Sequence, residues 1–380
     1  MTEATAGPAG FRIHTLAAGI GNDGRDDLAV LVSDRPCTSA AMYTQSRFAG
    51  PSVSYSRRVV QPVGVVVASR NANVATGEQG ARDAAELARL AEAATGRAPL
   101  LVASTGVIGR HYPMAEIRTR LAAEWPAPGA WADFATAIMT TDTHPKLVRA
   151  EVGPATIVGV AKGVGMIEPN LATMLTFFAT DAAIAEAELA AIFARVVEVS
   201  FNALSIDTDT STSDTAAIFA NGAAGPVELA EFEATLRRLA IELVQQIARD
   251  GEGASKLITV EVSGARDRDQ ARRVAKTVVN SPLVKTMVHG ADPNWGRVVM
   301  AVGKNSDDHD IDQDRVRVSL CQRPVYPEVP GEAVLAELSR AMQGDSVEIG
   351  IDLGIAEGNF TVYGCDLTAG YVHINSSYTT

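Results

Sequence analysis

Several strand-like runs in this sequence are apolar at nearly every position, and this feature constrains the fold more than any other. The segments 27–33 (DLAVLVS), 62–69 (PVGVVVAS) and 173–180 (TMLTFFAT) show little alternation of apolar and polar residues. A strand with one face in water alternates, whereas a strand covered on both faces does not. We therefore expect strands that are buried on both sides, as in a layered sandwich.

Helical patterns are interspersed with these strands, which predicts a mixed α and β class, here α+β. In four segments, apolar residues recur at helical spacing with charged residues between them. We expect helices over 79–94, 182–201, 227–249 and 266–279, and further strands over 100–104, 155–161, 257–263, 297–302, 316–320 and 347–353. The polar segment Lys304–Asp314 should form an exposed loop between strands.

The charge balance argues against a nucleic-acid partner. There are 33 Lys and Arg residues against 45 Asp and Glu residues, and the formal net charge of −12 has the wrong sign for neutralising phosphates. No uncharged apolar stretch reaches 18 residues, and the first residues do not resemble a secretory signal. Three separated cysteines without a CxxC spacing fit a reducing compartment. We expect a soluble, cytoplasmic protein without a membrane partner.

Short motifs do not reveal a nucleotide or metal site. Gly19–Gly24 matches GxGxxG, but a strand pattern follows where a dinucleotide site needs a helix, so we interpret it as a turn. Asp207 and Asp209 resemble the opening of an EF-hand, yet Thr212 replaces the required glycine. The acidic run 307–314 is interpreted as a solvated face rather than a cation site. We therefore expect neither a metal nor a resident cofactor.

One dense block, 162–182 (KGVGMIEPNLATMLTFFATDA), has residue types suited to covalent catalysis. Pro169 and Asn170 should form a turn, after which Ala172 precedes Thr173 at the head of an apolar strand. No GxSxG elbow occurs and no cysteine has a nucleophile context, so a Thr or Ser would have to carry such chemistry. Taken alone, a Thr at the start of a strand is usually only a β-former.

The block resembles the signature KGxGMIxPNxATML of the ornithine acetyltransferase family, also called bifunctional glutamate N-acetyltransferase. Other stretches resemble the same family in the same order: STGVIG at 104–109, MTTDT at 139–143, SIDTDTSTSDT at 205–215, DGEGASK at 250–256 and INSSYTT at 374–380. The resemblance therefore spans almost the whole chain. It implies a layered αββα sandwich of the Ntn-hydrolase-like type with a smaller carboxyl-terminal α/β subdomain.

The resemblance also implies that the chain cuts itself between Ala172 and Thr173. Residues 1–172 would form an α chain and residues 173–380 a β chain, and two copies of each would assemble into an α2β2 heterotetramer. Cleavage leaves Thr173 with a free α-amine beside its own hydroxyl. That amine has a reference pKa of about 7.7 to 8.0, so it can act as the base for the hydroxyl near neutral pH.

The implied reaction moves an acetyl group from N-acetyl-L-ornithine to L-glutamate in a ping-pong scheme through an acetyl-Thr173 ester. Thr105 and Gly106 would stabilise the oxyanion of each tetrahedral intermediate. The resemblance assigns substrate contacts to Thr140, Lys162, Thr173, Glu252, Asn375 and Thr380. We expect Lys162 to pair with the α-carboxylate and Glu252 to favour the side-chain ammonium of ornithine. Acetyl-CoA would be a second donor only if the enzyme is bifunctional.

Several alternatives remain open. Neighbouring Thr141 could supply the contact assigned to Thr140, Lys162 could be a surface cation, and Glu252 could simply lie in a helix-ending turn. Asn375 and Thr380 could belong to a docked carboxyl-terminal strand. The nearest rival function is a self-processed Thr-nucleophile amidohydrolase or aminopeptidase, and a non-enzymatic binding protein would remain one intact chain.

One position departs from the family pattern. The family commonly has a glycine between the two aspartates of the SxDxDTSTxDT stretch, where this chain has Thr208. Members with threonine there include paralogues encoded beside secondary-metabolite pathways. The departure leaves the pathway open between primary arginine biosynthesis and secondary metabolism.

Overall fold

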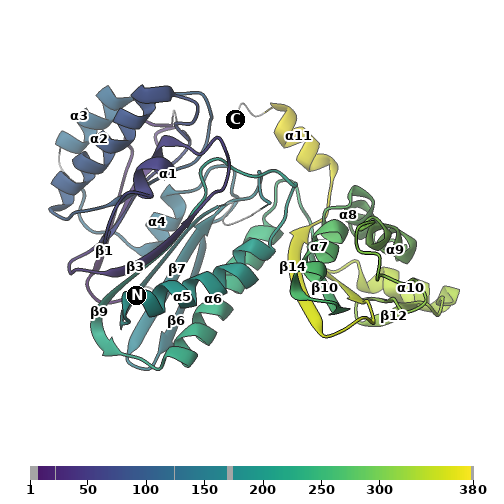
Figure 1. Ribbon diagram of the computed structural model, residues 1–380. Coiled ribbons are helices and arrows are strands. Elements are labelled where there is room, and N and C mark those ends of the chain that lie inside the picture. Colours follow the sequence, from purple (N-terminus) through teal and green to yellow (C-terminus); the bar gives the residue numbers. More distant parts are fainter. Residues whose placement is uncertain (1–6, 22, 124, 169–173, 378–380) are drawn as a thin grey trace.

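The computed structural model describes residues 7–21, 23–123, 125–168 and 174–377. Two β-sheets pack face to face, and a third sheet belongs to a smaller carboxyl-terminal subdomain (Figure 1). Helices cover the outer faces of the two packed sheets, so the larger part of the molecule is an αββα sandwich. The predicted α+β class and sandwich architecture are confirmed.

The first sheet has the strand order β1-β2-β4-β5. Its strands are β1 (Phe11–Leu16), β2 (Leu28–Ser33), β4 (Gly64–Ala68) and β5 (Leu101–Ser104). Neighbouring strands are antiparallel except for the parallel pair β4 and β5. The helices α2 (Gly77–Thr95) and α3 (Met114–Ala122) cover its outer face, and the short α1 (Pro51–Ser56) packs beside β5 and α2.

The second sheet has the order β3-β9-β8-β7-β6. Its strands are β3 (Thr38–Tyr43), β9 (Thr215–Pro226), β8 (Leu175–Ala183), β7 (Ala155–Lys162) and β6 (Lys146–Val152). Only β8 and β9 are parallel to each other. The long helices α5 (Glu186–Val199) and α6 (Leu229–Arg249) cover its outer face, and the 3-10 turn η2 (Phe201–Ala203) follows α5.

The fully apolar strands are explained by their two covered faces. In β2, Leu28 and Val30 contact the core beneath α2 and α3, whereas Ala29 and Leu31 contact the core between the two sheets. The helix α4 (Trp131–Ala137) adds Phe134 to the core between the sheets. Both faces of the strand are therefore dry, as the absence of alternation predicted.

The third sheet has the order β12-β11-β13-β10-β14. Its strands are β10 (Leu257–Ala265), β11 (Arg317–Leu320), β12 (Arg323–Tyr326), β13 (Ser346–Asp352) and β14 (Gly358–Cys365). The helices of this subdomain are α7 (Arg268–Val279), α8 (Pro282–His289), α9 (Trp295–Gly303) and α10 (Glu332–Ala341), and α7 packs on β10 and β14. Along β10, Ile258 and Val260 are buried whereas Glu261 is exposed, so this sheet keeps one face toward water.

The predicted strand over 297–302 is wrong, because this segment lies within α9. Val298, Ala301 and Val302 are buried at helical spacing, and Met300 is exposed. A short β-branched run is compatible with either a strand or a buried helix face, and here the helical period prevails. The helices predicted over 79–94, 227–249 and 266–279 are confirmed to within two residues at each end. The helix predicted from residue 182 begins later, because β8 continues to Ala183.

The predicted loop over 304–314 follows a helix rather than a strand, and its solvated-face interpretation is wrong for Asp308. The Asp308 side chain is 5% exposed and accepts hydrogen bonds from Arg266, Arg273 and Gln270. These donors, together with the arginine charges, hold the pKa of Asp308 below its ordinary value although burial acts in the opposite direction. The acidic run therefore anchors α7 and its flank through one buried carboxylate.

After β14 the chain returns toward the sandwich as the helix α11 (Ala369–Ser377), which Figure 1 draws in yellow. The docked strand considered for the carboxyl-terminal residues is therefore wrong for residues 369–377. No helix in the described ranges is long and apolar enough to cross a membrane.

Candidate active site

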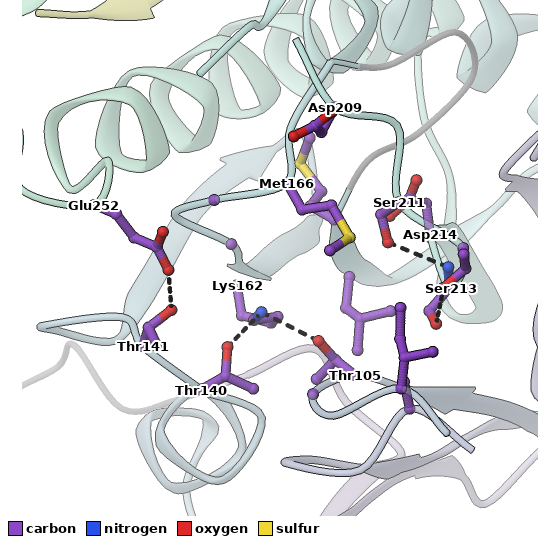
Figure 2. A pocket seen from close by; sticks show the side chains of 18 of the residues that line it. Thr105, Thr140, Thr141, Lys162, Met166, Asp209, Ser211, Ser213, Asp214 and Glu252 are labelled. Atoms are coloured by element: carbon purple, nitrogen blue, oxygen red, sulfur yellow. Dashed lines mark hydrogen bonds between the residues drawn. The ribbon is translucent and has the colours of Figure 1, made fainter. Parts of the chain in front are cut away.

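A cavity of about 270 Å³ lies at the end of the sandwich where β5 and β7 end and where β8 and β9 begin. The turn after α6 and one face of α11 complete its wall. Its lining includes seven of the residues named from the sequence: Thr105, Gly106, Thr140, Thr141, Lys162, Glu252 and Asn375. Motifs separated by up to 270 positions in the sequence therefore meet at one place (Figure 2).

The sheet register explains why these side chains meet. Lys162, the last residue of β7, pairs with Leu175, the first residue of β8, and Leu175 pairs in turn with Thr215, the first residue of β9. Thr215 also donates its backbone N–H to the Met174 carbonyl oxygen at 3.0 Å. Three strand ends thus form one row across the floor of the cavity.

Lys162 is a buried cation, and the surface-cation alternative is wrong. Its side chain is 9% exposed, and Nζ donates to Thr140 Oγ1 at 2.7 Å and to Thr105 Oγ1 at 3.2 Å (Figure 2). Burial lowers the pKa of Lys162, and the negative charge of Asp142, whose Oδ2 lies 3.9 Å from Nζ, opposes this. The ammonium is held by neutral hydroxyls and by an acid that is already engaged with other groups, so its charge remains available to a ligand.

A buried ion network lies beneath Lys162. Lys146 Nζ contacts Asp142 Oδ1 at 2.8 Å and Asp250 Oδ2 at 2.6 Å, with all three side chains almost fully buried. Asp142 also accepts from the backbone N–H groups of Gly163 and Thr140. Although burial raises the pKa of Asp142, the charges of Lys162 and Lys146 lower it to about 2. The network fixes the MTTDT loop and the end of α6 around the cavity.

The turn after β5 brings Thr105 and Gly106 to the wall of the cavity. Gly106 has φ +124°, and a Cβ there would lie 2.1 Å from the carbonyl carbon of Arg70, so only glycine fits. The Thr105 N–H is taken by the Ala68 carbonyl oxygen at 3.0 Å. The Thr105 hydroxyl accepts a hydrogen bond from Lys162 Nζ, so its own proton is free to be donated to a ligand. The backbone N–H of Gly106 has no acceptor within the described part of the chain.

Glu252 lies in the turn that ends α6, which was the alternative to a substrate contact, and its side chain also reaches the cavity. Oε1 accepts from the Thr141 hydroxyl at 2.9 Å, and Oε2 accepts from Asn375 Nδ2 on α11 at 2.8 Å. A Cβ at Gly165 would come within 2.6 Å of Oε2, so this glycine makes room for the carboxylate. Thr140 and Thr141 thus have different partners, Lys162 and Glu252 respectively.

Asp207 is a structural acid rather than the first ligand of a calcium loop. Its carboxylate accepts from the backbone N–H groups of Met166 and Ile167 at 2.7 and 2.8 Å, and Tyr371 donates to it at 3.4 Å. Burial, with the nearby charge of Asp207, raises the pKa of Tyr371 to about 12. Among the described residues, no group of three or more His, Cys, Asp and Glu side chains is arranged to hold a metal ion.

Three predicted site residues, Ala172, Thr173 and Thr380, lie outside the described residues, as does the turn predicted at Pro169 and Asn170. Sequence reasoning assigned no role to four other groups at or beneath the cavity: Asp142, Lys146, Asp214 and Asp250. Asp142, Asp214 and Asp250 stand within motifs that were singled out, but no local signal links Asp250 to Lys146, which lies 104 positions earlier.

The fold and the cavity define a class: an αββα sandwich with a small polar cavity that presents one buried lysine and one glutamate. The sequence model of the ArgJ family matches residues 12–380, and the chain belongs to this family. It is 58% identical to "Glutamate N-acetyltransferase Oat2" from Streptomyces clavuligerus, with 98% of each chain covered. It is 50% identical to "Arginine biosynthesis bifunctional protein ArgJ" from Rhodococcoides fascians, with 99% of this chain and 95% of that protein covered.

A solved structure supports the same relationship. The crystal structure of the arginine biosynthesis bifunctional protein argJ from Bacillus halodurans matches with 37% sequence identity and a TM-score of 0.51. The match covers 54% of this chain and 100% of that chain.

Proposed function

We propose that this protein is an acetyltransferase that moves an acetyl group from N-acetyl-L-ornithine to L-glutamate through an acetyl-Thr173 intermediate. The observation that carries the proposal is that Lys162 and Glu252 line one small cavity. A cation and a carboxylate at one cavity match an amino acid that has an α-carboxylate and a distal ammonium. The names of the relatives in the ArgJ family point to the same reaction.

Self-cleavage between Ala172 and Thr173 is part of this proposal. It divides the chain into residues 1–172 and 173–380, and the second piece has 208 of 380 residues, or about 55%. The solved Bacillus halodurans chain matches 54% of this chain over its whole length, which is the size expected for such a piece. We expect an α2β2 assembly of the two pieces.

In the first half-reaction, the Thr173 α-amine takes the proton of the Thr173 hydroxyl while Oγ attacks the acetyl carbonyl carbon. The C–N bond to ornithine then breaks, and the amine returns the proton to the leaving nitrogen. In the second half-reaction, the amine of glutamate attacks the ester and Oγ recovers a proton. Ornithine therefore leaves before glutamate attacks, which is the ping-pong order.

The Thr105 hydroxyl and the Gly106 N–H stabilise the oxyanion in both half-reactions. A donor of this kind typically contributes about 2.7 to 4 kcal/mol to lowering the barrier. Lys162 pairs with the substrate α-carboxylate and Glu252 with the side-chain ammonium, while Thr140, Asn375 and Thr380 supply further contacts. The reaction needs no resident cofactor, and acetyl-CoA serves as a second donor if the enzyme is bifunctional.

The reaction belongs to arginine biosynthesis or to a secondary-metabolite pathway served by a paralogue, and we expect the enzyme to act in the cytoplasm. The decisive experiment is incubation of purified protein with N-acetylornithine, with and without glutamate. Formation of N-acetylglutamate with equal release of ornithine supports the transferase. Release of acetate at a rate indifferent to glutamate would instead identify an amidohydrolase.

A further inference from the structure

Asp214 is the buried acid at this cavity that the reaction scheme leaves without a role. It lies directly before β9, and its backbone is fixed on both sides: its carbonyl oxygen accepts from Thr44 N–H at 3.1 Å, and the next residue, Thr215, donates to Met174. The residue is 2% exposed and lines the same cavity as Lys162. Figure 2 shows both side chains among those that line this cavity.

The surroundings of Asp214 lack a cation in contact. Within the described part of the chain its Oδ2 is buried without a hydrogen-bond partner, and no ion pair involves its carboxyl group. A buried carboxylate without a partner is strongly unfavourable, so such a group takes up a proton. Consistent with this, burial raises the pKa of Asp214 well above its ordinary value, and the Ser211 hydroxyl and the charge of Lys162 offset this only in part.

We propose that Asp214 is a specificity-determining residue that acts through Lys162: its neutral carboxyl leaves the lysine charge free for the carboxylate of the bound amino acid. This inference rests on the proposed function. The charges of the nearby network are already paired, because Lys146 contacts both Asp142 and Asp250. The charge of Asp214 therefore decides whether the Lys162 ammonium attracts an anionic ligand. When Asp214 is neutral, the substrate carboxylate is the anion that pairs with Lys162.

Ionisation of Asp214 would reverse this arrangement. The carboxylate would compete for Lys162 and repel the substrate carboxylate, and at an effective dielectric of about 20 such a charge weakens binding by roughly tenfold or more. The titratable groups that line the same cavity as Asp214 are Lys162, Asp207, Asp209, Glu252 and Tyr371, and Tyr43 on β3 pairs with the next residue, Thr215. Because burial raises the folded-state pKa of Asp214, the carboxyl keeps its proton to a higher pH than an exposed aspartate does, and it loses that proton as the pH rises through this pKa.

The test measures KM for N-acetylornithine from pH 6 to pH 9.5 in the processed wild-type enzyme and in Asp214→Asn. We expect the wild-type KM to rise about tenfold toward the alkaline end and the rise to be absent from Asp214→Asn, whose amide cannot ionise. Asp209→Asn is the matched control, since Asp209 lines the same cavity but is exposed, and it should retain the wild-type rise. Asp214→Ala, which also cannot ionise, provides a second variant with the same expectation.

A decarboxylated ligand sharpens the test. N-acetylputrescine lacks the α-carboxylate, so its inhibition constant should not follow the alkaline rise. A wild-type KM that stays flat to pH 9.5, or a rise that survives in Asp214→Asn, overturns the inference while acetyl transfer by the wild type leaves the proposed function intact. Failure of the Asp214 variants to be cleaved would assign Asp214 to processing and would also overturn it. Absence of acetyl transfer in the wild type would refute the proposed function itself.

Discussion

Asp142, beneath the cavity, and Asp214, in its lining, are both buried acids, and they have opposite surroundings. Asp142 contacts Lys146, lies 3.9 Å from the ammonium of Lys162 and accepts two backbone N–H groups, and its pKa falls to about 2. Asp214 has no cation in contact within the described residues, and burial raises its pKa. The comparison teaches that burial alone does not decide the charge of an acid: the partners that the fold supplies decide it.

Removal of Lys146 should have the largest effect, because it takes away the ammonium that contacts the carboxylates of both Asp142 and Asp250. Lys146→Met removes this shared cation from two buried carboxylates, although Asp142 keeps the more distant Lys162, and we expect a loss of about 3 to 5 kcal/mol in the free energy of unfolding. Urea denaturation measures it. Arg149→Met, on the same strand but exposed, should cost less than about 1 kcal/mol. Equal losses of unfolding free energy in the two variants would show that the buried network stabilises the fold no more than an exposed ion pair does.

The pH dependence of stability should have opposite signs at the two acids. The pKa of Asp142 falls from 3.8 to about 2, so its stabilisation, about 2 kcal/mol, is present above pH 4 and lost as the pH falls through 2. The pKa of Asp214 is raised, so its contribution favours folding at low pH and declines as the pH rises toward that pKa.

Unfolding free energies of wild type, Asp142→Asn and Asp214→Asn, measured from pH 3 to pH 9, test these signs. The deficit of Asp142→Asn relative to wild type should shrink in acid, and Asp214→Asn should gain on wild type as the pH rises. Parallel curves for all three proteins would mean that neither acid changes its pKa on folding.

Glu252→Gln tests how an acid that lines the cavity acts on the bound substrate. Glu252 faces the cavity with partners that are neutral, Thr141 and Asn375, so its negative charge is available to a ligand ammonium. We expect KM for N-acetylornithine to rise about tenfold, with a smaller change for glutamate, which has no side-chain ammonium. Steady-state kinetics with each substrate varied gives both values. An unchanged donor KM would make the assignment of Glu252 wrong.

The smallest expected effect distinguishes Thr140 from Thr141. Thr140→Ala removes a hydrogen bond to Lys162 Nζ, and Thr141→Ala removes one to Glu252 Oε1. Each bond joins a hydroxyl to a charged group, but Lys162 keeps its bond to Thr105 and Glu252 keeps its bond to Asn375, so we expect changes in KM of only a few-fold. Thr140→Ala should affect substrates through their carboxylate, both donor and acceptor, whereas Thr141→Ala should affect mainly the donor. The reverse pattern would exchange the two assignments.

The sequence predicted the sandwich strands β2, β4, β5, β7 and β8, because their apolar runs reflect two covered faces, whereas β1, β3 and β6 were not predicted. It did not predict β9, whose residues 215–226 are rich in Ala and Gly and have little intrinsic strand preference. It also missed α11, whose polar and apolar residues are scattered around the helix. In both segments tertiary packing overrides the local signal.

The candidate site was predicted in part for a similar reason. Short motifs identified Lys162, Glu252, Thr105 and Gly106, because the resemblance attaches roles to them. The partners of these residues depend on contacts between distant segments, such as Lys146 with Asp250, and no local pattern encodes such a contact. The unpaired state of Asp214 is likewise a property of the packed site rather than of its neighbours in the sequence.

Intact-mass measurement of the purified wild type and Thr173→Ala, paired with an acetyl-transfer assay, tests the central claim most directly. We expect the wild type to form two fragments that begin at Met1 and Thr173 and to make N-acetylglutamate, whereas the Thr173→Ala variant should remain uncut and inactive. A wild-type chain that is active at its full 39.9 kDa, or a Thr173→Ala variant with undiminished turnover, would contradict it.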